Sequence, residues 1–80
     1  MAKKRRKSRE ICGFTEILFF NDDSIEVSHC GNMGNTKKDV MKNIKIIFDK
    51  NKYDFNQYVL ESETGSPDYL YTANYTKVKS

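Results

Sequence analysis

The chain has 80 residues, of which 38% are hydrophobic, so it is long enough for one small domain and too short for a catalytic domain beside a binding domain. No apolar stretch approaches the ~20 residues that a membrane-spanning helix requires. The single proline, four glycines and moderate charge argue against a disordered or collagen-like chain.

Positive charge gathers at the N-terminus. Six of the 14 basic residues lie in the first ten positions, beside the acidic Glu10: Lys3, Lys4, Arg5, Arg6, Lys7 and Arg9. Residues 1–10 thus carry +5, whereas residues 11–80 hold eight basic and ten acidic residues, or −2. Because like charges repel, we expect a flexible basic arm over residues 1–10 and a single domain over residues 11–80. Deletion of residues 1–9 should then leave the fold intact.

The apolar run that follows the basic residues does not resemble a secretory signal, because Thr15 and Glu16 interrupt it and no small-residue cleavage site follows. We therefore expect a cytoplasmic protein, or a nuclear one in a eukaryotic host, since Lys4–Lys7 is a cluster of the kind that import receptors bind. In a reducing compartment Cys12 and Cys30 are expected to be free thiols, although two cysteines near the ends of one hairpin could also pair.

The segment from Ile11 to Phe20 is rich in β-branched and aromatic residues, which predicts a strand that is apolar on both faces and central in its sheet. Turn-forming polar residues follow at positions 21–24. A second strand is expected over Ser24–Cys30, where Ile25, Val27 and His29 alternate with polar residues. Together these features predict a hairpin.

A helix is expected next. Thr36 and Asp39 have the spacing of a weak capping box, so the helix should begin near Lys37, and it should end about Lys50–Lys52. Apolar residues recur at helical spacing and should pack on the sheet: Val40, Met41, Ile44, Ile47 and Phe48.

The C-terminal part is predicted to be a second hairpin. Tyr53–Thr64 fits a short helical stripe or a strand, and we favour the strand because a Gly65–Asp68 turn and an alternating Tyr69–Val78 segment follow it. The expected fold class is α+β, a small single domain in which two antiparallel β-hairpins flank one amphipathic helix (ββαββ).

Groups suited to catalysis or metal binding are few. His29 cannot easily activate Cys30, because adjacent strand residues point to opposite faces, and Cys12 remains the alternative. We favour the simpler reading, in which His29 continues the apolar face of its strand and both cysteines behave as small hydrophobic residues. The carboxylates near the turn at Asp22 and Asp23 fit a solvated hairpin tip as well as a cation site. We therefore expect no enzymatic activity, no cofactor and no metal.

Two other features suit ligand binding. The Gly31–Asn35 loop leads into Lys37 and Lys38 at a helix N-terminus, where an anion such as phosphate could bind, although a simple strand-to-helix connection explains it too. On the last strand, side chains at alternate positions could stack on bases, anchor a protein partner, or be buried under the helix: Tyr69, Tyr71 and Tyr75.

The leading hypothesis is a small non-enzymatic binding module that associates with nucleic acid, or with a nucleic-acid-bound protein assembly, through its basic arm. The expected contacts are the six basic arm residues from Lys3 to Arg9, together with Lys37 and Lys38. The alternative is a protein-binding inhibitor or adaptor, of the kind phages encode, that docks on a host protein through its Tyr-rich sheet or a sheet edge. The mildly acidic body favours this alternative.

Overall fold

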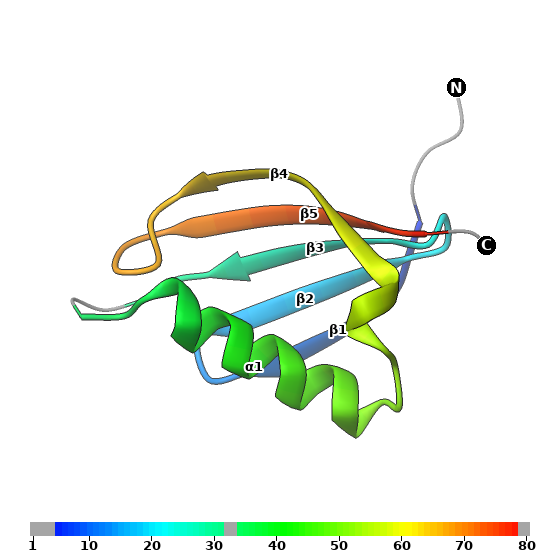
Figure 1. Cartoon of the computed structure of the whole chain (residues 1–80), viewed down its shortest axis with the longest axis horizontal. Helices are drawn as coiled ribbons and strands as arrows, with labels where there is room; N and C mark the ends of the chain where they lie inside the picture. Colours follow the sequence, from blue (N-terminus) through cyan, green and yellow to red (C-terminus); the bar gives the residue numbers. More distant parts are fainter. Residues whose placement is uncertain (1–4, 32–33, 79–80) are drawn as a thin grey trace.

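The computed structural model of the chain describes residues 5–31 and 34–78. A five-stranded antiparallel sheet is combined with one α-helix and one short 3-10 helix (Figure 1). In chain order the elements are β1 (Arg6–Cys12), β2 (Thr15–Phe20), β3 (Ser24–His29), α1 (Lys37–Lys50), η1 (Phe55–Gln57), β4 (Tyr58–Gly65) and β5 (Tyr71–Lys77). The fold class is therefore α+β, as expected. Within the described residues, no helix has the length and apolar character needed to cross a membrane.

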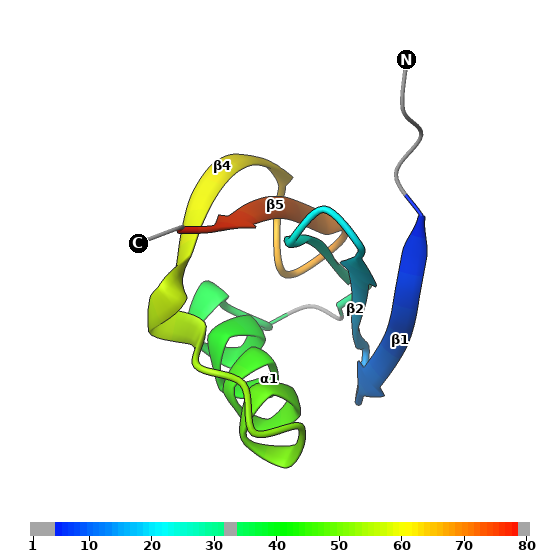
Figure 2. The same ribbon diagram turned by 90° about the vertical axis from the view of Figure 1, so that its right-hand side faces the viewer.

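All strands belong to one sheet in the order β1-β2-β3-β5-β4, so the prediction of two hairpins flanking the helix is wrong. β5 pairs with β3 from Ser24↔Thr76 to His29↔Tyr71, and this joins the N-terminal strands to the C-terminal hairpin. The physical reason is that a separate two-stranded hairpin leaves both its edges unpaired and is marginally stable in water. The sheet curves around α1, which lies on its concave side (Figure 2).

A tight turn at Gly13 and Phe14 divides the segment that we expected to form one strand. Gly13 has φ +61°, and a glycine with positive φ at the first position of a two-residue loop is what a type II′ hairpin turn requires. Cys12 pairs with Thr15 across this turn. β2 lies between β1 and β3, which agrees with the interior position expected for its apolar residues.

The first strand consists largely of residues that we expected in a flexible arm. Residues 6–10 lie in β1, and all of them except Lys7 pair with β2, beginning with Arg6↔Phe20. The expected arm boundary at residue 10 is therefore wrong, because backbone hydrogen bonds to β2, with the cations turned to solvent at a sheet edge, outweigh the repulsion between neighbouring cations. Lys3 and Lys4 lie outside the described residues.

The second predicted strand and the helix are confirmed. β3 buries Ile25, Val27 and His29, and α1 begins at Lys37. The Thr36 backbone N–H donates to Asp39 Oδ2 at 2.7 Å, which is the reciprocal contact of a capping box. This hydrogen bond holds the pKa of Asp39 below its usual value. The helical stripe lies as expected, with Met41 half-buried at its margin and four residues buried: Val40, Ile44, Ile47 and Phe48.

The C-terminal segment forms a hairpin after the short helix η1. β4 starts at Tyr58, five residues later than expected, because Phe55–Gln57 form η1 instead of strand. β5 starts at Tyr71, two residues later than expected. Gly65 has φ +82°, and a Cβ atom at this position would lie 1.9 Å from the Leu70 carbonyl oxygen. The turn therefore requires glycine, both for its backbone conformation and for this close approach.

An aromatic cluster closes the core between α1 and the sheet. Phe48 is 1% exposed and stands at its centre. Its ring centroid lies 5.0–6.1 Å from four other aromatic rings: Phe19, Tyr53, Phe55 and Tyr58. Three of these contacts have the perpendicular geometry that aromatic pairs favour. The cluster connects the helix to η1 and so positions the start of β4.

We expect Ile44→Ala to lower the free energy of unfolding by about 2–5 kcal/mol, because Ile44 is a fully buried residue on the side of α1 that packs on the sheet. Ile46→Ala is the matched control, since Ile46 is on the same helix and 46% exposed; its effect should stay within about 0.5 kcal/mol. Urea unfolding followed by circular dichroism measures both. Equal effects of the two variants would contradict the observed orientation of the helix.

The structure reverses the expectation for deletion of residues 1–9. This truncation removes the part of β1 that pairs with Leu18, Phe19 and Phe20, and it leaves that half of β2 unpaired along one edge. Several ladder hydrogen bonds are lost, each with a net value of about 0.5–1.5 kcal/mol, so we expect a loss of at least about 2 kcal/mol. Thermal and urea unfolding test this. An unchanged midpoint would mean that β1 is not a stable part of the sheet.

Candidate nucleic-acid interface

Four cationic side chains follow one another along a free edge of the sheet. Arg5, Arg6, Lys7 and Arg9 are all exposed, and β1 is the outermost strand. The pairing register shifts around Lys7, which makes it the extra residue of a β-bulge. Arg9 forms an ion pair with Glu16, whereas the other three cations form no ion pair within the described part of the chain. Three neighbouring positive charges are therefore available to an anionic ligand.

The sheet face opposite α1 adjoins this basic edge. Arg6 is the cross-strand partner of Phe20 and Arg9 that of Leu18, so each pair shares this outer face. Both apolar side chains are half-buried. No helix of the described residues covers them, because α1 packs on the other face, where Ile17 is fully buried. Arginines thus stand directly beside apolar contact surface.

Small polar side chains make up much of the remaining outer face. Its half-buried or exposed members on the last three strands of the sheet are Glu26, Ser28, Ser62, Thr64, Thr72, Asn74 and Thr76. Asn74 Nδ2 donates to Ser62 Oγ at 3.3 Å. Hydroxyl and amide groups both donate and accept hydrogen bonds, so this surface can contact base edges or peptide groups. Glu26 is the acidic residue in this set.

Lys37 and Lys38, the other expected nucleic-acid-binding residues, are far from the basic edge. They begin α1 at the end of the long axis opposite to the start of β1 (Figure 1). Lys37 Nζ lies 2.7 Å from Glu63 Oε2, and the Tyr71 hydroxyl donates to the same oxygen at 2.5 Å. The structure therefore does not combine these lysines with the basic strand into one site, and β4 balances the charge of Lys37.

The glycine loop before α1 has a packing role at its first residue. A Cβ atom on Gly31 would lie 2.0 Å from the Pro67 carbonyl oxygen and 2.6 Å from Asn35 Oδ1. Gly31 thus makes room for the turn between β4 and β5. Asn32 and Met33 lie outside the described residues. Together with the cap at Thr36, this favours the reading of the loop as a strand-to-helix connection.

The candidate stacking tyrosines divide into two groups. Tyr71 and Tyr75 are 3% and 6% exposed and belong to the core, so they cannot serve as an exposed stacking platform. Burial also raises the pKa of both hydroxyls above the usual value. The physical reason is that α1 covers their face of the sheet, which confirms the alternative of burial under the helix. Tyr69 is 79% exposed in the turn before β5 and remains accessible to a ligand.

His29 belongs to a polar network rather than to a Cys–His pair. The residue is 2% exposed, and its Nδ1 and Nε2 atoms lie 2.7 Å from Thr15 Oγ1 and 3.2 Å from Asn35 Oδ1. Cys12 Sγ lies 3.7 Å from Asn43 Oδ1. Both ring nitrogens of His29 thus have polar partners other than a thiol. Cys12 and Cys30 are free thiols, as expected.

The sequence interpretation missed the outer-face role of Leu18 and Phe20. Both were assigned to the buried apolar faces of a central strand. Glu16 lies on the same face of β2 as Leu18 and Phe20, because alternate residues of a strand share a face. A charged residue on this face was the available signal that the face meets solvent. The turn at Gly13 hid this signal, because a continuous strand from Ile11 placed the apolar Phe14 on the same face.

A comparison of the chain with protein-family models, curated proteins and solved structures finds no match.

We expect acid to destabilise the fold partly through Glu63. A hydrogen bond from Lys37, and to a smaller extent one from Tyr71, holds the pKa of Glu63 below its usual value of 4.5. Such a carboxylate contributes stability above its unfolded-state pKa, and this contribution is lost as the pH falls from 4.5 through the folded-state pKa. Glu63→Gln should therefore reduce the difference in unfolding free energy between neutral and acidic pH.

Urea unfolding at a series of pH values from neutral to strongly acidic measures this difference. Glu61→Gln, on the same exposed strand, is the matched control for loss of one carboxylate. If both variants reduce the acid sensitivity equally, the contacts of Glu63 with Lys37 and Tyr71 are not its cause.

Proposed function

We propose that the protein is a small non-enzymatic binding module that holds single-stranded nucleic acid along β1 and the adjoining outer face of the sheet. The observation that carries this proposal is the succession of exposed cations at Arg5, Arg6, Lys7 and Arg9 on a free sheet edge. Residues 5–9 span about 13 Å at the rise of a β-strand, enough for several successive phosphates. Neutralising phosphates releases counterions and provides affinity with little dependence on sequence.

The side chains of the outer face favour binding of single-stranded nucleic acid over binding of a duplex. An unpaired strand exposes its bases, which can lie on apolar side chains while its phosphates contact arginines. Leu18 and Phe20 provide such apolar surface beside Arg9 and Arg6, and the hydroxyl and amide groups nearby can bond to base edges. Glu16 already neutralises Arg9, so Arg5, Arg6 and Lys7 are assigned the phosphate contacts.

The hydrogen bonds of His29 support a binding function without catalysis. A general acid or base must reach a reacting group, and His29 is buried with both ring nitrogens bonded to Thr15 and Asn35. Cys12 bonds to Asn43 instead of a base.

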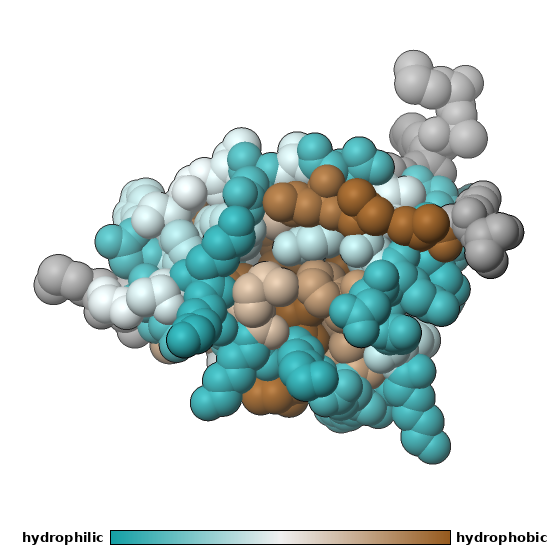
Figure 3. Space-filling view, in the orientation of Figure 1, coloured by the Kyte–Doolittle hydropathy of each residue, from teal (hydrophilic) through white to brown (hydrophobic). Residues whose placement is uncertain are grey.

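The second candidate function is docking of a protein partner at the opposite edge of the sheet. An apolar band crosses the face of the molecule where β4 begins beside the end of β5 (Figure 3). Its residues are 40–54% exposed: Val59, Leu60 and Val78. An edge strand with exposed apolar side chains can accept a further strand from a partner protein. This surface is distinct from β1, so variants can separate the two functions.

We expect affinity for an arbitrary single strand to fall steeply with salt. Each phosphate neutralised contributes about 0.7 to the slope of log affinity against log salt concentration. Replacement of Arg6 and Lys7 together by glutamine should therefore flatten the slope by about 1.4, whereas replacement of Lys38 and Lys42 by glutamine removes equal charge from the helix and should leave it unchanged. Fluorescence anisotropy with a labelled oligonucleotide measures the slopes.

Failure to bind any strand at low salt would eliminate the nucleic-acid function. Equal flattening by the two double variants would show only a general effect of net charge and would reject β1 as the interface. Leu60→Ser on β4 provides the complementary control, because the cross-strand partner of Leu60 is Tyr75 on the other face of the sheet. This variant should leave nucleic-acid affinity unchanged, and it should weaken the binding of a protein partner that docks at the apolar band.

A further inference from the structure

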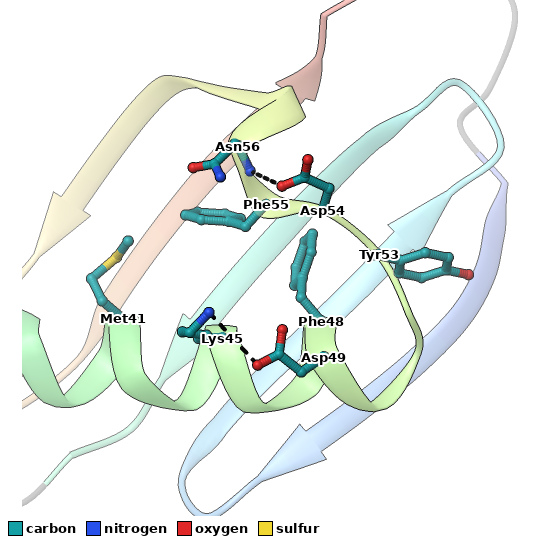
Figure 4. Close-up of a pocket in the computed structure, with 8 residues that line it drawn as sticks. All are labelled: Met41, Lys45, Phe48, Asp49, Tyr53, Asp54, Phe55 and Asn56. Carbon is teal, nitrogen blue, oxygen red and sulfur yellow. Dashed lines mark hydrogen bonds and ion pairs between the residues drawn. The ribbon is translucent and has the colours of Figure 1, made fainter.

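A pocket of about 250 Å³ lies between α1 and the segment that leads into β4 (Figure 4). Its apolar part consists of Met41, Phe48 and Phe55. Polar groups surround this apolar part from both elements: Lys45 and Asp49 from α1, and Asp54 and Asn56 from the η1 region. Tyr53 completes the lining, with its hydroxyl directed away from the other residues (Figure 4).

Phe55 provides the accessible aromatic surface of the pocket, and the buried Phe48 ring lies behind it. The Phe48 and Phe55 rings have centroids 5.0 Å apart and an interplanar angle of 76°, so they stand nearly at right angles. Phe48 is buried and fixed by its contacts in the core, whereas Phe55 is half-buried. An aromatic face carries negative electrostatic potential and attracts a cation within about 6 Å of the ring centroid.

The charges around the pocket favour a cation over an anion. Two carboxylates and one ammonium group line it, which gives a formal charge of −1. Lys45 Nζ and Asp49 Oδ2 lie 3.7 Å apart, and both side chains are mostly exposed, so their mutual attraction is weak. Asp54 Oδ1 accepts the Asn56 backbone N–H at 3.0 Å. The second oxygen of Asp54 forms no hydrogen bond or ion pair with the described part of the chain, which leaves it for a ligand.

We propose that this pocket binds a methylated ammonium group, presented by a small molecule or by a methylated lysine side chain. Methyl groups gain by contact with Met41 and Phe55, which are both half-buried, while the positive charge is balanced by Asp49 and Asp54. A bare ammonium fits less well, because stripping its water costs free energy that apolar groups do not return. The volume is ample, since an engineered protein cavity of about 150 Å³ holds benzene.

A pair of isosteric ligands tests the requirement for positive charge. Choline and 3,3-dimethyl-1-butanol have nearly the same shape, and only choline is charged. We expect the methyl signal of Met41 and the amide signals of Phe55 and Asn56 to shift on titration of the full chain, with choline bound at least about fivefold more tightly. Equal affinity of the neutral alcohol, or no shift of these signals with either ligand, would overturn the proposal.

Two variants with opposite effects separate binding chemistry from folding. Asp54→Asn keeps a side chain that caps η1 but removes its charge, so choline affinity should fall about fivefold. Lys45→Gln removes the competing ammonium group and should raise it. Asp68→Asn, in the turn before β5, is the control for loss of an exposed carboxylate. A weaker choline affinity in Lys45→Gln would mean that the Lys45 ammonium group does not compete with the ligand, and it would contradict the proposal.

The same titration distinguishes the source of the group. An acetylated and amidated trimethyllysine that binds more tightly than choline would indicate that the pocket also contacts the lysine stem, whereas equal affinity would indicate recognition of the head group alone. This inference does not depend on nucleic-acid binding, because Arg6 and Lys7 lie outside the pocket. Loss of choline binding in Asp54→Asn with unchanged oligonucleotide affinity would confirm that the two sites are separate.

Discussion

Six consecutive cross-strand pairs between β3 and β5 connect two parts of the chain that α1 separates in sequence. β3 already has β2 on its other side, so this pairing makes β3 the middle strand and leaves only β1 and β4 as edges. The inward residues of β3 and β5, among them Val27 and Ala73, then form a continuous apolar surface that α1 can cover. The curvature of the sheet, the aromatic cluster around Phe48 and the exposure of the outer face all follow from this arrangement.

The elements that could be predicted are those whose signals are local. The helix from Lys37 to Lys50 has a cap, an apolar stripe and a polar face within one segment, so its limits were predicted within two residues. The sheet order depends on which strand β5 joins, and no local pattern contains that information. β1 was missed because a run of cations was interpreted from its charge repulsion alone. Backbone pairing with β2 is a tertiary interaction, and at a sheet edge the charged side chains remain in water, where their repulsion is screened.

The same limit explains which parts of the candidate site could be predicted. Composition identified the basic residues of the candidate site as a group, yet their arrangement along a sheet edge follows only from the register with β2. The alternation of Tyr71 and Tyr75 was visible in the sequence, but whether that face meets solvent depends on where α1 packs. The pocket beside Phe55 has no sequence signal, because its walls come from α1 and η1 and are brought together by the aromatic cluster.

Charge divides the surface into regions suited to different ligands. The β1 edge has three cations without ion pairs within the described residues, whereas β4 exposes Glu61 and Glu63, and Asp49 and Asp54 line the pocket. Pairing of two β1 edges, or of two β4 edges, would bring like charges together, and each edge also contains a bulge, so both edges resist pairing with their own kind. A polyanion is repelled from the carboxylates of the pocket, and an organic cation is repelled from β1. Under the two proposals, one chain of 80 residues could therefore hold an anionic polymer and a cationic group at the same time, because each ligand is excluded electrostatically from the site of the other.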